Sequence, residues 1–151
     1  MLITKKIEID MGHRIPNHIS KCRNLHGHRY VIEIGVNDNL ITKAGDSSEG
    51  MVMDFGILKQ IMMEEIDSIY DHGFCIHVKD SLIDVFIKLQ RQGERVIICD
   101  FIPTAEELAK HWYCMIKKRL ESANIRILHC KVWETPTSTA IFRREDESTN
   151  S

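Results

Sequence analysis

Two stretches near the N-terminus alternate between apolar and polar residues, and this period of two constrains the fold most. In the first stretch, Ile7, Ile9 and Met11 share one parity, while charged residues occupy most of the other positions. The second stretch runs from about Gly27 to Asn37 and repeats the pattern. Such alternation is typical of β-strands that bury one face and leave the other in solvent. We therefore expect a sheet that other elements cover on one side.

Two segments have both the apolar spacing and the N-caps of amphipathic helices, and a third has the spacing with Gly93 as a stop. The first spans Phe55 to about Tyr70 and begins after the N-cap residue Asp54. The second begins after Thr104, which forms the T-x-x-E spacing of a capping box with Glu107. A shorter helix is expected over residues 81–92.

Three more stretches are expected to be strands, at residues 95–102, about 126–134 and 139–143. The main elements then follow the order two strands, helix, strand, helix, two strands. This order predicts an α+β fold with a single domain over residues 1–143, in which helices cover one face of a largely antiparallel sheet. The polar residues 144–151 are expected to form a solvated C-terminal tail.

The composition excludes several classes of protein. The 151 residues carry a formal net charge of −2, which removes the electrostatic argument for a nucleic-acid partner. No apolar run approaches the roughly 18–20 residues that span a bilayer, and the N-terminal sequence lacks the apolar region of a signal peptide. The five cysteines are scattered, so we expect no disulfide framework and a cytoplasmic, reducing environment.

Three histidines near the N-terminus form the strongest candidate site. His26 and His28 lie at the start of the second strand, where a period of two projects both side chains from one face. His13 continues the apolar parity of the first strand, so the three imidazoles converge if the strands pair as a hairpin. Three imidazoles with one open position are typical of a catalytic zinc site, and the alternative is that they are ordinary surface or core histidines. The remaining histidines are interpreted as ordinary ones: His18, His77, His111 and His129.

Cys22 lies four residues before His26, between two basic residues. It could be a fourth metal ligand, a catalytic base or nucleophile, or an inert buried thiol, and spacing alone does not choose among these roles. Asp71 and His72 follow the first helix. This pair is either an acid that tunes a histidine or an ordinary turn at a helix end.

Two glutamates complete the set of candidates. Glu106 lies in the first turn of a helix, where the macrodipole favours an anion whatever its function. Glu134 continues an apolar strand parity, and a partly buried carboxylate there needs partners. It would suit a flat pair of N–H donors, such as the edge of a guanidine-like heterocycle.

Six segments occur in one order along the chain: GHRIP, CRNLHGH, GMVMDFGILK, DHG, PTAEELA and ETPTSTA. Together they resemble the 6-pyruvoyl-tetrahydropterin synthase / 6-carboxy-tetrahydropterin synthase family, from His13 to Ala140. The resemblance implies the tunnelling fold (T-fold), an antiparallel four-stranded sheet with two helices on one face. It also implies trimers whose sheets close into a barrel, and two trimers that stack into a homohexamer with active sites between subunits.

The resemblance further implies a role for each candidate residue. One zinc ion per subunit would be held by His13, His26 and His28. The proton-transfer set, assembled across a subunit interface, would be Cys22, Asp71 and His72. The aminopyrimidine edge of a pterin would be anchored by Glu134, with Glu106 assisting.

The interval of three residues between Cys22 and His26 resembles the bacterial 6-carboxy-tetrahydropterin synthases of queuosine and 7-deazaguanine biosynthesis. The implied activity is that of a carbon–carbon lyase, which converts 7,8-dihydroneopterin triphosphate to 6-carboxy-5,6,7,8-tetrahydropterin, acetaldehyde and triphosphate. Three basic residues are candidates for holding the triphosphate: Arg14, Lys21 and Arg29.

Three other functions stay open. The first is a 6-pyruvoyl-tetrahydropterin synthase on the same scaffold, although that branch resembles a longer interval before the HGH motif. The second is a non-catalytic, zinc-stabilised pterin-binding oligomer. The third is a generic zinc hydrolase, which the absence of an HExxH motif opposes. The segment 80–93 is an open question, as a possible determinant of assembly or of access to the site.

Overall fold

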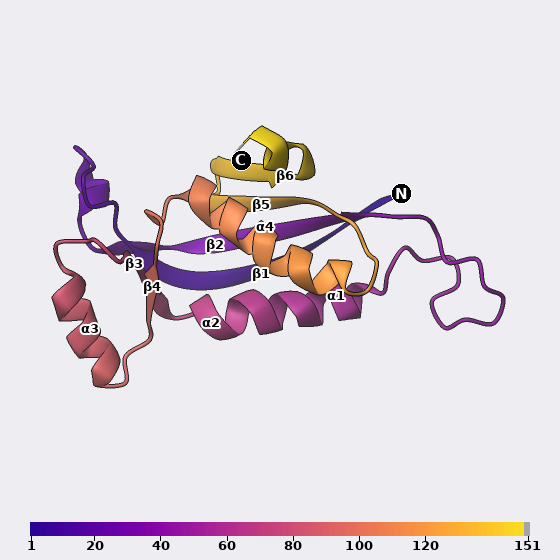
Figure 1. Cartoon of the computed structure of the whole chain (residues 1–151), viewed down its shortest axis with the longest axis horizontal. Helices are drawn as coiled ribbons and strands as arrows, with labels where there is room; N and C mark the ends of the chain where they lie inside the picture. Colours follow the sequence, from indigo (N-terminus) through magenta and orange to yellow (C-terminus); the bar gives the residue numbers. More distant parts are fainter. Residues whose placement is uncertain (150–151) are drawn as a thin grey trace.

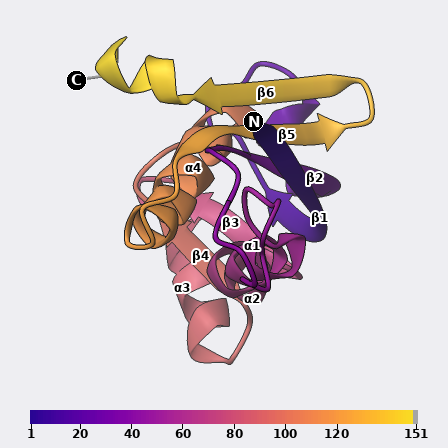
Figure 2. The ribbon, with the colours of Figure 1, turned by 90° about the vertical axis from the view of Figure 1, so that its right-hand side faces the viewer.

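The computed structural model describes residues 1–149, which fold around one six-stranded sheet of order β4-β3-β1-β2-β5-β6 (Figure 1). Figure 2 shows the pronounced curl of this sheet from β6 to β1. The strands have these bounds: β1 Leu2–His13, β2 His26–Asn37, β3 Gly73–His77, β4 Val96–Cys99, β5 Ile127–Thr135 and β6 Ser138–Arg143.

The sheet is mixed, with an antiparallel part and a parallel part. Strands β1, β2, β5 and β6 pair antiparallel, as expected, whereas β3 pairs parallel to β1 and β4 parallel to β3. The α+β fold class is therefore confirmed, but the sheet has six strands, where the residue pattern predicted five and the family resemblance implied four.

Sequence reasoning missed β3 because this strand is covered on both faces. Its Cys75 belongs to the main core, whereas Ile76 belongs to a second cluster with Phe86 and Val96. A strand buried on both sides has no alternation of apolar and polar residues, so it carries no signal with a period of two. The expectation that all helices cover one face is wrong. The helix in the segment 80–93 packs on the other face of β3 and β4, where Phe86 joins Ile76 and Val96.

The helices begin where the capping residues predict. Helix α1 (Phe55–Met62) starts after Asp54, whose carboxylate accepts a hydrogen bond of 2.6 Å from the Gly56 N–H. Helix α4 (Ala105–Glu121) starts after Thr104, whose hydroxyl accepts one of 3.3 Å from the Glu107 N–H. The other helical segments are a π-helical turn η2 (Met63–Asp67), α2 (Ser68–Tyr70), α3 (Ile83–Arg91) and two short 3-10 helices, η1 (Lys21–Arg23) and η3 (Arg144–Thr149).

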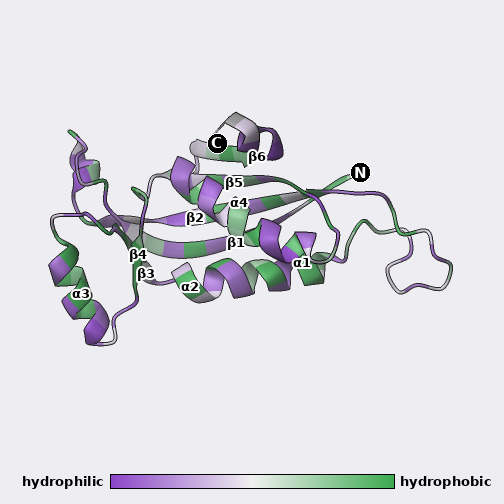
Figure 3. Cartoon of the chain, viewed as in Figure 1, coloured by the Kyte–Doolittle hydropathy of each residue, from purple (hydrophilic) through white to green (hydrophobic). Residues whose placement is uncertain are grey.

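The main core lies between α1, α4 and one face of the sheet. Figure 1 shows α1 and α4 along the long strands, with α3 apart from them at the end that carries β3 and β4. Along α1, α3 and α4, hydrophobic and hydrophilic residues alternate as the helix turns (Figure 3). Fully buried side chains of the helices meet those of β2: Leu58, Met62, Trp112, Ile116, Tyr30 and Ile32.

The C-terminal segment that was expected to be a solvated tail forms η3 in the described residues. Glu147 accepts a hydrogen bond of 2.5 Å from the Tyr113 hydroxyl and one of 2.6 Å from the Lys117 ammonium. The segment is thereby tied to α4. Among the described residues, no helix is both long enough and apolar enough to span a membrane.

The packing of α1 generates a prediction about stability. Leu58 is fully buried against the sheet, whereas its neighbour Ile57 is 51% exposed. Leu58→Ala should lower the free energy of unfolding by about 2–5 kcal/mol through the cavity it leaves, and Ile57→Ala by less than about 0.5 kcal/mol. Urea denaturation followed by circular dichroism measures both values. Equal losses in the two variants would contradict this orientation of α1.

Candidate active site

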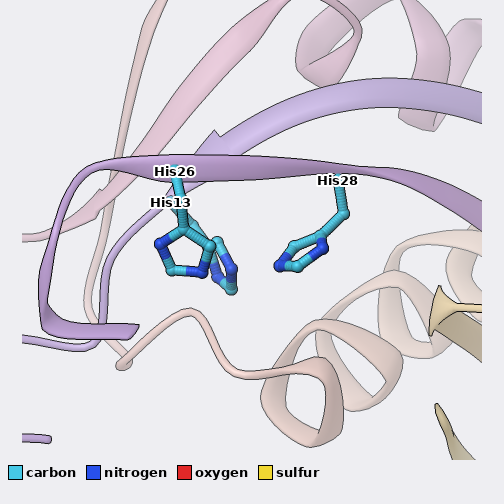
Figure 4. Close-up of side chains that lie close together, drawn as sticks. All are labelled: His13, His26 and His28. Carbon is cyan, nitrogen blue, oxygen red and sulfur yellow. The ribbon is translucent and has the colours of Figure 1, made fainter. Parts of the chain in front are cut away.

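The pairing of β1 with β2 brings three histidines together. His13 is the register partner of His26, and Met11 is that of His28, so the three imidazoles share the face that the helices cover. Ring centroids are 4.5 Å apart for His13 and His26, 5.2 Å for His13 and His28, and 5.1 Å for His26 and His28. One nitrogen of each ring lies within 4.8 Å of the others, and Figure 4 shows the rings pointing into a common space. The structure thus forms the cluster expected from the H-x-H pattern.

Two of the imidazoles are oriented by backbone carbonyls. His13 donates its Nδ1–H to the Pro103 carbonyl at 2.6 Å, and His26 donates its Nδ1–H to the Asn24 carbonyl at 2.8 Å. Each bond leaves the Nε2 lone pair of that ring free for a metal ion. Such bonds from the second ring nitrogen are typical of metal-ligating histidines, because they fix the tautomer and the ring orientation. The residues present therefore fit a divalent metal ion.

Burial favours the neutral form of His13 and His28. His13 is fully buried, and desolvation lowers its pKa; desolvation likewise lowers the pKa of His28. In each case the nearby Glu134 carboxylate opposes the shift without reversing it. Neutral imidazole is the form that binds a metal ion, so the electrostatic environment agrees with the geometry.

Two glycines allow the chain to pass close to the cluster. A Cβ atom on Gly27, between His26 and His28, would lie 2.8 Å from the Met11 carbonyl oxygen. A Cβ atom on Gly12 would lie 2.4 Å from the Phe74 ring. Side chains at these positions would push β1, β2 and β3 apart, so the glycines permit the close packing of strands around the histidines.

Glu134 lies beside the histidine cluster. One of its carboxylate oxygens is 3.6 Å from Nε2 of His13 and 3.9 Å from Nε2 of His28. Tyr30 donates a hydrogen bond of 3.5 Å to the same oxygen, and its hydroxyl is 3.3 Å from each ring nitrogen of His13. Burial and the Glu134 charge both raise the pKa of Tyr30, which stays protonated as a donor. Sequence reasoning missed Tyr30 because its parity is that of a core residue.

A cavity of about 350 Å³ brings Cys22, Glu106 and Glu134 together, and it meets the histidine cluster through Glu134. Cys22 lies in η1, and its N–H donates to the Ser20 hydroxyl at 3.3 Å. Glu106 is in the first turn of α4. The cavity is completed by Ile15, His18, Thr104, Ala105, Ser138, Thr139 and Ala140. Three residues that are far apart in the sequence thus bring a thiol and two carboxylates into one cavity.

Asp71 and His72 form a separate pair. The Nδ1–H of His72 donates to the Asp71 carboxylate at 2.7 Å, and the Asp10 N–H donates to the same carboxylate at 2.8 Å. The bond from Asp10 is the main cause of a lowered pKa of Asp71, and the bond from His72 adds to it. His72 has a φ of 58° and a side chain that is 78% exposed. Within residues 1–149, neither residue lines the cavity that holds Cys22.

Two of the three basic residues proposed to hold phosphate are engaged elsewhere. The Nε atom of Arg14 lies 3.3 Å from the carboxylate of Asp80, which is fully buried. Arg29 donates two hydrogen bonds, of 3.0 and 2.9 Å, to the carboxylate of Asp10. Lys21 is exposed in η1. Neither arginine lines the cavity beside Cys22.

Comparisons with known proteins agree with these features. A family model described as 6-pyruvoyl tetrahydropterin synthase matches residues 2–145. A 6-carboxy-5,6,7,8-tetrahydropterin synthase of Rickettsia conorii is 38% identical over 134 residues, which cover 88% of this chain and 93% of that protein. The protein of the same name from Aquifex aeolicus is 34% identical over 164 residues, covering 95% of this chain and 98% of its own.

Solved structures share the fold. An uncharacterized protein from Wolinella succinogenes superposes with a TM-score of 0.81 at 21% identity, over 95% of this chain and 98% of its own. The 6-pyruvoyl tetrahydropterin synthase of Caenorhabditis elegans superposes with a TM-score of 0.67 at 19% identity, over 95% and 94%. The fold, the family model and the relatives agree: the chain belongs to the 6-pyruvoyl tetrahydropterin synthase family, and it is an enzyme of the lyase type.

Proposed function

We propose that this protein is a zinc-dependent 6-carboxy-5,6,7,8-tetrahydropterin synthase. It would convert 7,8-dihydroneopterin triphosphate to 6-carboxy-5,6,7,8-tetrahydropterin, acetaldehyde and triphosphate, in the pathway to 7-deazaguanines and queuosine. The observation that carries the proposal is a cavity lined by Cys22 and Glu134, in which Glu134 lies 3.6 and 3.9 Å from two imidazoles of the histidine cluster. Relatives of that name at 34–38% identity support the product assignment. The five cysteines are all free, which suits a reducing cytoplasm.

The donor set favours zinc as the metal. Three imidazoles with an open fourth position match a catalytic zinc site, and the site would hold one ion per subunit through His13, His26 and His28. When bound, the ion would act as a Lewis acid that stabilises negative charge on the side-chain oxygens of the pterin substrate.

The residues around the cluster would bind the pterin and transfer protons. Glu134 would accept two hydrogen bonds from the aminopyrimidine edge of the pterin, with Glu106 assisting from the first turn of α4. Cys22, as the thiolate, would remove a proton from a side-chain carbon of the substrate. His72 would exchange a proton through its Nε2, because Asp71 holds the Nδ1–H and thereby orients the ring.

Because Asp71 and His72 lie outside the cavity of their own chain, we propose that they reach the Cys22 of a neighbouring subunit. The proposed assembly is a homohexamer, a dimer of trimers. The sheet of one chain supports this idea because it ends at β4 on one side and β6 on the other, and closure into a barrel would cover such edges.

The second candidate function is that of a 6-pyruvoyl-tetrahydropterin synthase, which the description of the matching family model favours. Product analysis separates the two. Incubation of the purified protein with 7,8-dihydroneopterin triphosphate should give 6-carboxy-5,6,7,8-tetrahydropterin by mass, together with acetaldehyde. A pyruvoyl product without acetaldehyde would support the second candidate, and failure to consume the substrate would favour a non-catalytic binding protein.

Removal of one proposed ligand should lower the metal content. His26→Ala leaves two imidazoles at the site, so bound zinc, measured by mass spectrometry of the purified protein, should fall well below about one ion per subunit. His77→Ala, a histidine outside the cluster, serves as the control and should keep its zinc. Full zinc retention in His26→Ala would count against the site of three histidines.

Mixed assemblies test whether the catalytic residues come from different subunits. Cys22→Ala and His72→Asn should each lose at least about a hundredfold in turnover, because each lacks one proton-transfer group. Asparagine is chosen because it tolerates the positive φ of position 72. Unfolding and refolding an equal mixture should restore about a quarter of the wild-type activity, since random assembly gives that share of intact sites.

Each variant refolded alone is the control for this experiment. A mixture that stays as inactive as the two single variants would show that Cys22 and His72 do not meet across an interface. Wild-type turnover in Cys22→Ala alone would reject the role of Cys22 as the base.

A further inference from the structure

His18 shares the cavity with Cys22, Glu106 and Glu134, although its sequence context marks it as an ordinary histidine. It lies on the exposed connection between β1 and η1. The same connection carries Cys22. This placement puts an imidazole at the wall of the proposed substrate site.

Local hydrogen bonds fix the tautomer of His18. The Ser20 N–H donates to His18 Nδ1 at 3.0 Å, and the Ser20 hydroxyl lies 2.7 Å from the same atom. A ring nitrogen that accepts a backbone N–H carries no proton, so the neutral ring carries its proton on Nε2. The Ser20 hydroxyl also accepts the Cys22 N–H, at 3.3 Å. Ser20 therefore connects the histidine to the backbone of the cysteine.

The charged side chains that line the cavity are carboxylates. Its lining contains the carboxylates of Glu106 and Glu134, and no lysine or arginine from the described part of the chain. Among the described lining residues, His18 supplies the one imidazole, and its Nε2–H is a hydrogen-bond donor. An anionic group would be repelled by the carboxylates and would find a hydrogen-bond donor at His18.

We propose that His18 is a substrate-binding residue whose Nε2–H binds the triphosphate of 7,8-dihydroneopterin triphosphate. This inference rests on the proposed function. In the proposed orientation of the substrate, the aminopyrimidine lies at Glu134 and the phosphates lie toward the connection that carries His18 and Cys22. Arg14 and Arg29 pair with Asp80 and Asp10, and neither arginine lines this cavity to bind the phosphates.

The test compares ligands with and without phosphate. In His18→Ala, the KM for 7,8-dihydroneopterin triphosphate and the inhibition constant of inorganic tripolyphosphate should each rise about tenfold, because a hydrogen bond to a charged group is lost. The Kd for 7,8-dihydroneopterin, measured by its fluorescence, should stay within about twofold. His18→Gln should restore part of the affinity, since its side-chain N–H can replace the Nε2–H. Asn17→Ala, an exposed neighbour that does not line the cavity, is the control and should change neither constant.

Each outcome separates the inference from the proposed function. If the wild-type protein binds 7,8-dihydroneopterin and His18→Ala changes neither phosphate-dependent constant, the role of His18 is overturned and the proposed function stands. Equal weakening of all three ligands would also overturn it, because His18 would then act on the shape of the site. A wild-type protein that binds none of the ligands would overturn both.

Discussion

The register between β1 and β2 is the constraint on which the site depends. Because His13 pairs with His26, the side chain of His28 two residues further on joins them on the face that the helices cover. A slip of one residue would turn His26 and His28 to the open face and leave His13 alone in the core. The register is held by the apolar face that the two strands share, where Ile7 and Ile9 pair with Ile32 and Tyr30. The same burial that stabilises the sheet therefore positions the proposed metal ligands.

The site is completed by elements from the other end of the sequence. The Pro103 carbonyl, just before α4, orients His13, and the first turn of that helix brings Glu106 to the cavity. Glu134 reaches the histidines from β5, which pairs with β2. One chain thus builds a cluster of histidines that fits a metal ion and a cavity beside Glu134. It leaves Asp71 and His72 on a separate surface, and this division is the physical reason to propose a site between subunits.

The sequence predicted those parts of the structure that local periodicity and caps determine. Both long strands and the starts of α1 and α4 at Asp54 and Thr104 follow from spacing and capping residues, and the approach of the three histidines follows once the two strands pair as a hairpin. Strand β3 was missed because it is buried on both faces and lacks alternation. The bonds of His13 to Pro103 and to Tyr30, and the place of His18 in the cavity, depend on tertiary packing that no local pattern encodes.

The central claim is that three imidazoles bind one divalent ion while Cys22 stays free to act as a base. X-ray absorption at the zinc edge of the metal-loaded protein tests it directly, since Zn–N and Zn–S distances differ, at about 2.0 and 2.3 Å. The account predicts three imidazole nitrogens, one further light atom and no sulfur. A sulfur ligand at the longer distance, or fewer than three imidazoles, would contradict it.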